Sequence, residues 1–86
     1  MKFRSVTIPR FWELYDRLPS DVQARAEKQY ELFSSNPGHP SLHLKHVGDF
    51  WSVRVTDAYR ALALFDGHEF TWVWIGTHDE YERITG

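Results

Sequence analysis

A group of basic and titratable side chains falls in the second half of this 86-residue chain. Three of them are the cations Lys45, Arg54 and Arg60, and His78 and Tyr81 follow the last apolar run. Lys and Arg bind phosphate oxygens, and a guanidinium can hold two such oxygens in a fork. An imidazole titrates near neutral pH, so it can accept or donate a proton. This combination predicts a site for an anionic substrate, and RNA is the substrate class that it fits best.

Cleavage of RNA without a metal is the reaction that these side chains suit. The ribose 2′-OH attacks phosphorus, so a base takes its proton, cations stabilise the phosphorane oxygens, and an acid protonates the leaving 5′-oxygen. We assign the phosphate to Arg60, with Lys45 and Arg54 assisting. His78 is the candidate acid or base, and Tyr81 orients a base of the RNA or takes part in proton transfer.

Each of these assignments has a purely structural alternative. Arg60 can pair with Asp57 at the surface, and the other two cations can lie on a solvated strand face. The late histidine can bond to backbone at a strand end, and the late tyrosine can pack a terminal turn onto the sheet. Both interpretations stay open at the level of the sequence.

Three further histidines, His39, His43 and His46, lie close together and suggest a metal site at first sight. Their spacing falls on a loop and a strand instead of one helix face, and no cysteine or carboxylate completes a ligand set. We therefore expect no metal and no cofactor. Residues 38–60 hold all three cations of the site, so His43 and His46 are instead candidate contacts for RNA.

Apolar periodicity predicts an α+β fold. Thr7 is the expected cap of a first helix, and Ser20 with Gln23 makes a capping box for a second. The two helices form a hairpin that packs on a mainly antiparallel sheet of about four to five strands. The expected strands cover residues 3–7, 42–47, 51–56, 59–65 and 70–75, and a short tail follows.

The last two expected strands are predicted to form a β-hairpin with aromatic side chains buried on one face. Asp66-Gly67 is a strong turn signal between them. Phe70, Trp72 and Trp74 alternate along the last strand, so we expect all three rings on the core side of the sheet.

Composition sets limits on these interpretations. The formal net charge is −2, whereas a nucleic-acid binder normally carries a basic excess, so any basic surface must be local. The chain has no cysteine, no export signal and no apolar run long enough to span a membrane. We expect a single cytoplasmic domain over residues 1–86 with no membrane partner.

The ordered series of motifs resembles the RelE/ParE superfamily of toxins from toxin–antitoxin systems. The resemblance is carried by Trp51-Ser52-Val53-Arg54-Val55-Thr56-Asp57-Ala58-Tyr59-Arg60, by Leu44-Lys45 before it, and by Ile75-Gly76-Thr77-His78-Asp79-Glu80-Tyr81 after it. The order of the expected helices and strands is also similar. The resemblance implies a small α+β toxin bound by a cognate antitoxin, in a toxin–antitoxin hetero-oligomer.

The family has two branches, and they imply different activities. The ribonuclease branch, which includes YoeB-like toxins, cleaves mRNA on the ribosome without a metal, so mRNA and the ribosome become expected partners. Arg60 resembles the catalytic arginine of that branch, and Tyr81 its late tyrosine. Its general-base glutamate has no counterpart here, because Leu42-His43 stands in that place, and His43 is the alternative base. The other branch inhibits DNA gyrase, so a non-catalytic binder of gyrase or of an antitoxin is the alternative function.

Overall fold

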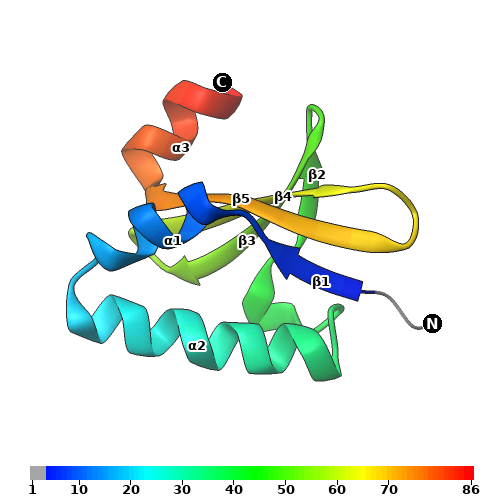
Figure 1. Cartoon of the computed structure of the whole chain (residues 1–86), viewed down its shortest axis with the longest axis horizontal. Coiled ribbons are helices and arrows are strands. Elements are labelled where there is room, and N and C mark those ends of the chain that lie inside the picture. Colours follow the sequence, from blue (N-terminus) through cyan, green and yellow to red (C-terminus); the bar gives the residue numbers. More distant parts are fainter. Residues whose placement is uncertain (1–3) are drawn as a thin grey trace.

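The fold is a five-stranded sheet with helices on both of its faces (Figure 1). The predicted α+β class, with a two-helix hairpin on a mainly antiparallel sheet, is confirmed. In this computed structural model, which describes residues 4–86, the elements are β1 (Arg4–Thr7), α1 (Pro9–Asp16), α2 (Ser20–Ser35), the 3-10 turn η1 (Pro40–Leu42), β2 (Lys45–Val47), β3 (Phe50–Thr56), β4 (Tyr59–Phe65), β5 (Glu69–Thr77) and α3 (His78–Thr85). Phe3, the first residue of the expected first strand, lies outside the described residues.

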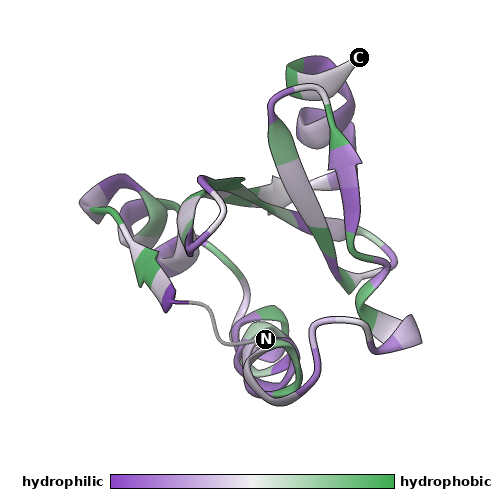
Figure 2. Cartoon of the chain, turned by 90° about the vertical axis from the view of Figure 1, so that its right-hand side faces the viewer, coloured by the Kyte–Doolittle hydropathy of each residue, from purple (hydrophilic) through white to green (hydrophobic). Residues whose placement is uncertain are grey.

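The strands follow the order β1-β5-β4-β3-β2 across the sheet. Strands β2 to β5 pair as consecutive antiparallel hairpins, whereas β1 pairs with β5 in parallel. The predicted turn at Asp66-Gly67 joins β4 to β5, and Gly67 has a φ of 101°, which a glycine adopts without strain. Figures 1 and 2 show α2 beneath the sheet and α3 beyond its opposite face.

One face of the sheet packs against α2 and holds the main core; we call it the core face. The ring of Phe33, from α2, meets Phe70 and Trp72 edge-on, with centroid distances of 5.0 and 5.2 Å. Alternate residues of β3 and β4 contribute small and branched side chains to the same cluster, as strand geometry requires. Such edge-to-face pairs stabilise a small core beyond their buried area.

A register shift in β5 changes which residues face the core. Ala63 pairs with Trp72 but Leu62 pairs with Trp74, so Val73 is an extra residue in β5. Trp72 therefore joins the core with Phe70, whereas Trp74 lies outside that cluster, on the opposite face with Leu62. The prediction that all three rings share one face is wrong for Trp74. A β-bulge of this kind cannot be seen in a pattern of alternating residues.

The predicted strand over 42–47 is wrong in its first half. Pro40 begins the 3-10 turn instead, and the side chain of His39 accepts a hydrogen bond from the backbone N–H of Ser41 at its start. Leu42 is fully buried, and His43 adopts a left-handed conformation with a φ of 47°. The strand begins only at Lys45, after the chain has turned back towards the sheet.

Both predicted helix caps are also wrong. Ile8 is the N-cap of α1, and the Thr7 hydroxyl instead accepts a hydrogen bond from the Trp12 indole N–H at 2.8 Å. Pro19 precedes α2, and the Gln23 side chain donates to the Tyr15 carbonyl at 3.0 Å. These side chains tie α1 to β1 and to α2, and those tertiary contacts replace the local caps.

The expected tail is a helix. Thr77 and Glu80 form a capping box at the start of α3, with the Thr77 hydroxyl accepting from the Glu80 N–H and the Glu80 carboxylate accepting from the Thr77 N–H. The pattern Thr-x-x-Glu was present in the sequence and would have indicated this helix start.

Gly76, the residue just before this cap, has no room for a side chain. A Cβ there would lie 2.6 Å from the Trp74 ring and 2.9 Å from the Glu80 carboxylate. We therefore expect Gly76→Ala to lower the free energy of unfolding by about 1–3 kcal/mol, because the ring and the cap must both move. Gly38→Ala is the matched control, since its nearest neighbour would lie at 3.6 Å. Urea unfolding measures both variants, and equal losses would contradict the packing described here.

Candidate active site

The cations predicted from the sequence share the sheet face opposite α2; we call it the cationic face. Residues that pair across neighbouring strands point to the same side, as do alternate residues of one strand. Lys45 pairs with Ser52, which lies two residues before Arg54 on β3. Arg54 in turn pairs directly with Arg60 on β4, and Arg60 pairs with Gly76 on β5. The sheet therefore places Lys45, Arg54 and Arg60 on one face, with the two arginines directly opposite each other.

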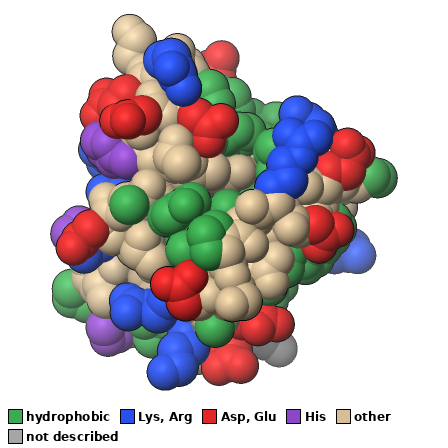
Figure 3. All heavy atoms as spheres, turned by 90° about the vertical axis from the view of Figure 1, so that its left-hand side faces the viewer, with side chains coloured by type: hydrophobic (Ala, Val, Ile, Leu, Met, Phe, Trp, Pro, Cys, Tyr) green, Lys and Arg blue, Asp and Glu red, His purple; other side chains and the backbone are tan. Residues whose placement is uncertain are grey.

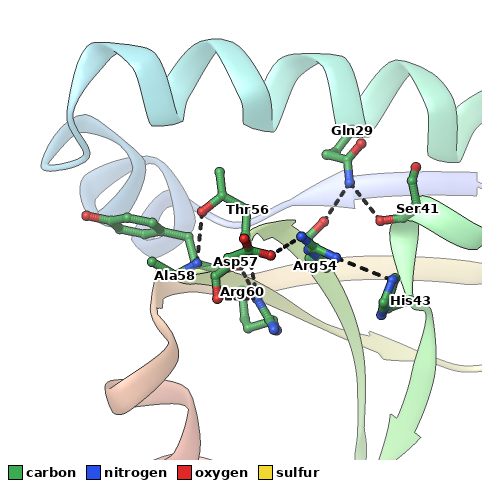
Figure 4. A network of polar contacts seen from close by, with 9 residues as sticks. Gln29, Ser41, His43, Arg54, Thr56, Asp57, Ala58 and Arg60 are labelled. Atoms are coloured by element: carbon green, nitrogen blue, oxygen red, sulfur yellow. Dashed lines mark hydrogen bonds and ion pairs between the residues drawn. The ribbon is translucent and has the colours of Figure 1, made fainter.

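Two arginines directly opposite each other repel, and local groups offset that cost. The guanidinium of Arg54 forms an ion pair with the carboxylate of Asp57 in the β3–β4 turn (Figure 4). On its other side, Arg54 Nη1 lies 3.5 Å from Nε2 of His43. The left-handed backbone of His43 aims its exposed ring at the arginine from outside the strand. Arg54 is thus held between an acid and an imidazole.

Arg60 is held by backbone carbonyls of the same turn. Its Nη1 donates to the oxygens of Thr56 at 2.6 Å, Tyr59 at 2.9 Å and Asp57 at 3.3 Å. Its Nη2 and Nε make no hydrogen bond with any residue in the range 4–86. One edge of the guanidinium is therefore fixed, while another edge keeps the two N–H donors that a phosphate fork needs.

His78 lies at the first position of α3, beside the β3–β4 turn. Its backbone N–H donates to the Ala58 carbonyl at 2.7 Å, which fixes the start of the helix against that turn. Its side chain is 39% exposed, and Nε2 lies 3.4 Å from a carboxylate oxygen of Glu82, one helical turn later. The imidazole is therefore accessible to solvent and lies beside a carboxylate.

Tyr81 is buried and is not exposed on the cationic face. It is only 4% exposed, and its hydroxyl is 3.3 Å from the hydroxyl of Ser52, which is itself 1% exposed. The structure thus places Tyr81 as an anchor of α3 on the sheet, in keeping with the packing alternative. A buried hydroxyl that is already hydrogen-bonded cannot reach a substrate without movement of α3.

His46 is not brought together with the other candidates. It pairs with Trp51 across β2 and β3, and its ring stacks on that tryptophan with a centroid distance of 4.9 Å. Trp51 packs against Phe65 and Phe70 of the core cluster. His46 therefore lies on the core face, on the side of the sheet away from Lys45.

Gln29 is a residue of this region that sequence reasoning missed. Its side-chain N–H groups donate to the carbonyls of Arg54 at 2.8 Å and Ser41 at 3.2 Å (Figure 4). It is 8% exposed, so the α2 helix holds β3 and the segment leading to His43 through a buried amide. A glutamine on a helix carries no pattern that would identify this role.

Charges around the site are mixed. Figure 3 shows acidic, basic and histidine side chains interspersed over the end of the molecule where α3 begins. Within the described part of the chain, no three His, Cys, Asp or Glu side chains come together as a metal-binding group. No helix formed by residues 4–86 is long and apolar enough to cross a membrane.

Comparison with known proteins decides the family. The sequence profile of the ParE-like toxin domain matches residues 20–83, which is most of the chain. The chain belongs to the RelE/ParE superfamily of toxins. It is a toxin of the RelE/YoeB/ParE type found in toxin–antitoxin systems. No curated protein matches its sequence.

Solved structures share the fold of this toxin at low sequence identity. A chain of the RelB-RelE antitoxin-toxin complex from Methanococcus jannaschii has a TM-score of 0.74 and 10% identity, over 94% of this chain and 99% of that one. The YoeB/ParE toxin from Agrobacterium tumefaciens has a TM-score of 0.68 and 14% identity, over 88% and 99%. A mutant of the E. coli toxin RelE in the free state has a TM-score of 0.68 and 16% identity, over 95% and 90%.

The buried pair of hydroxyls beneath α3 gives a test of the role of Tyr81. Tyr81→Phe should lower the free energy of unfolding of the toxin by about 0.5–1.5 kcal/mol, because the Ser52 hydroxyl loses its buried partner. A double-mutant cycle with Ser52→Ala, followed by urea unfolding, measures the coupling between the two. Growth inhibition by the folded variant should match the wild type. If the variant loses toxicity but keeps its stability, Tyr81 takes part in the reaction and the packing role described here is contradicted.

Because Glu80 caps α3, the free energy of unfolding of the toxin should depend on pH in the acidic range. Hydrogen bonds from the N–H and then the hydroxyl of Thr77 lower the pKa of Glu80 below its ordinary value of 4.5, and Arg83 adds a smaller effect. Ionised Glu80 therefore contributes its full stabilisation above pH 4.5. This stabilisation is lost as the pH falls through the lower pKa that Glu80 has in the folded state. The difference in unfolding free energy between wild type and Glu80→Gln should shrink between about pH 5 and about pH 2. Urea unfolding across that range measures it, and a constant difference would contradict the capping role.

Proposed function

We propose that this toxin is a metal-independent endoribonuclease that cleaves mRNA on the ribosome. The observation that supports the proposal is the pair of arginines placed directly across β3 and β4, one of which keeps a free donor edge. Two accessible imidazoles come from neighbouring segments, His43 beside Arg54 and His78 at the start of α3, against the β3–β4 turn. A phosphodiester would neutralise the repulsion between the arginines, as expected of a site built for an anion.

In the proposed reaction the RNA itself supplies the nucleophile. A base removes the proton from the ribose 2′-OH, its oxygen bonds to phosphorus, and the bond from phosphorus to the 5′-oxygen breaks. An acid gives a proton to that leaving oxygen. The products are a 2′,3′-cyclic phosphate on one fragment and a 5′-hydroxyl on the other, and no metal is required.

Each remaining side chain has a role in this scheme. Arg60 holds the non-bridging oxygens through its Nη2 and Nε donors, where negative charge grows in the transition state. Lys45 and Arg54 hold neighbouring phosphates of the strand. His43 and His78 supply the base and the acid, in either order, since an imidazole can both accept and donate a proton.

We also propose that a cognate antitoxin binds this toxin. The solved complexes from Methanococcus jannaschii, Pyrococcus horikoshii and E. coli each pair RelE with RelB, and this chain shares their fold. An acidic segment of the antitoxin would cover the cationic face and compete with RNA for Arg54 and Arg60. The partner would thereby form a hetero-oligomer with the toxin and inhibit it.

Arg60 gives the sharpest test of the proposed activity. Arg60→Ala should slow cleavage of mRNA in a translation extract by about 10²–10³-fold, because a donor to the developing charge is lost. Arg60→Lys keeps the charge but not the fork, so it should recover only part of the rate. End-group analysis of the fragments should find 2′,3′-cyclic phosphate in the wild-type reaction.

The controls separate chemistry from folding. Arg10→Ala removes an exposed arginine of α1 that pairs with Glu13, and it should cleave at the wild-type rate. Thermal unfolding of each variant checks that loss of the carbonyl contacts of Arg60 has not unfolded the β3–β4 turn. Full cleavage by folded Arg60→Ala would refute the assignment of the phosphate to this residue.

A second candidate function is a non-catalytic binder, either an inhibitor of DNA gyrase or a relative that only binds an antitoxin. Two observations favour it: Arg54 is already paired with Asp57, and Tyr81 is buried. This candidate predicts no RNA fragments in the extract. Supercoiling by purified gyrase in the presence of the toxin then distinguishes an inhibitor of gyrase from an inactive relative.

A further inference from the structure

The second half of β3 has a free edge, because the neighbouring strand β2 is short. Lys45, the first residue of β2, pairs with Ser52, so within the described sheet the part of β3 after Ser52 has no strand beside it on that side. The backbone carbonyl of Arg54, two residues further on, accepts a hydrogen bond from the side chain of Gln29 on α2. A buried carbonyl without a donor is costly, so the amide satisfies a need that β2 leaves unmet.

A single side-chain nitrogen bridges this edge to the 3-10 turn η1. Gln29 Nε2 donates to the Arg54 carbonyl at 2.8 Å and to the Ser41 carbonyl at 3.2 Å (Figure 4). A primary amide nitrogen carries two N–H donors, so these two bonds use both of them. Gln29 is 8% exposed, and water therefore has little access to replace it. The amide thus ties together two segments from different parts of the chain.

The two carbonyls belong to the segments that carry His43 and Arg54. Ser41 precedes His43 by two residues, and Nε2 of His43 lies 3.5 Å from Nη1 of Arg54. Apart from glycines, His43 is the one residue in the range 4–86 with a positive φ, at 47°. An unfavourable backbone conformation persists only where the surrounding contacts impose it, and such residues cluster at functional sites.

Burial of Leu42 alone does not fix the direction of the His43 ring. Leu42 lies between Ser41 and His43, and its full burial attaches the turn to the core. The hydrophobic effect has no direction, whereas a hydrogen bond constrains both the distance and the angle between the groups that it joins. The amide of Gln29 therefore supplies the directional constraint that the apolar anchor lacks.

We propose that Gln29 is a positioning residue for RNA cleavage, which holds the His43 imidazole beside the Arg54 guanidinium. The inference rests on the proposed ribonuclease function, in which His43 is one of the two residues that transfer protons. Such a group must lie within hydrogen-bond reach of the atom that it serves. Gln29 comes from α2, on the core face, so it acts through the two segments that it holds and does not touch the RNA.

Gln29→Met tests this role, because methionine has a similar length and no N–H donor. Both carbonyls then lose their donor and must move to reach water, which shifts His43 relative to Arg54. The single-turnover rate of mRNA cleavage on purified ribosomes should fall by about 10–100-fold, the range expected when a reacting group is displaced by about 1 Å. The toxin concentration that gives half of the maximal rate should stay within about twofold, because the cations still bind phosphates.

The His43→Ala background separates positioning from structural support. If the amide acts through His43, Gln29→Met should change the rate by no more than about twofold once the imidazole is absent. A purely structural role would lower the rate by the same factor in both backgrounds.

Gln23→Met is the matched control. The Gln23 amide also lies on α2 and donates to a distant carbonyl, that of Tyr15, at 3.0 Å. This bond ties α2 to α1 and involves no residue of the cationic face, so the control should cleave at the wild-type rate.

Nuclear magnetic resonance provides a measurement that does not require cleavage. The wild type should show nuclear Overhauser effects between the ring protons of His43 and the side chain of Arg54. Gln29→Met should lose these effects, and Gln23→Met should keep them. Gln29→Glu is the second variant, because it keeps the shape of the side chain and has no donor when ionised. It replaces Gln29→Met if that variant does not fold, and urea unfolding checks each sample.

Three results would overturn the proposal. One is that the contacts between His43 and Arg54 persist in a folded variant of Gln29, and another is that the rate loss is equal with and without His43. The third is that neither variant folds, because the amide would then serve the fold as a whole. If the wild type cleaves no RNA, the proposed function fails, and the nuclear Overhauser effects alone decide whether Gln29 sets the geometry of the pair.

Discussion

One extra residue in β5 is the constraint on which the rest of the structure depends. Val73 shifts the pairing between β4 and β5 by one position, so Trp72 enters the core and Trp74 faces the other way. A shift of one residue moves every later side chain to the opposite face of a strand. Ile75 consequently returns to the core, and Gly76 comes to lie opposite Arg60 on the cationic face. The position of α3 follows, because its cap begins directly after Gly76.

The β3–β4 turn then gathers the charged groups. Its carbonyls fix one edge of Arg60, its Asp57 pairs with Arg54, and its Ala58 carbonyl holds the start of α3 at His78. Three separate parts of the chain thus meet through a two-residue turn. The turn therefore fixes the guanidinium groups of both arginines on one face of the sheet.

The two sides of the sheet present different surfaces for interaction. On the cationic face, positive groups are held by local acids and carbonyls, and the net charge of −2 means that such a surface stays small. On the opposite side, an apolar groove stays open between α1 and α2. The two sides of the sheet therefore differ in charge and in polarity.

The sequence by itself determined the class of fold, the order of most elements and the family. Alternation in 51–56 and 59–65 and the Asp66-Gly67 turn placed the central hairpins, because side-chain period and turn chemistry are local properties. The same alternation put Arg54 and the core valines of β3 on opposite faces, and this is confirmed. The start of α3 was also encoded locally, in the Thr77 to Glu80 capping box, although it was not recognised.

Only the tertiary structure decided which candidate side chains meet. His46 and Lys45 are neighbours in the chain, yet strand alternation and stacking on Trp51 put His46 on the far face. Tyr81 was assigned to chemistry, but docking of α3 buries its hydroxyl against Ser52. Gln29 and the bulge at Val73 have no local signature either. Their roles arise from contacts between residues far apart in the sequence, and the packing of the whole chain is what creates those contacts.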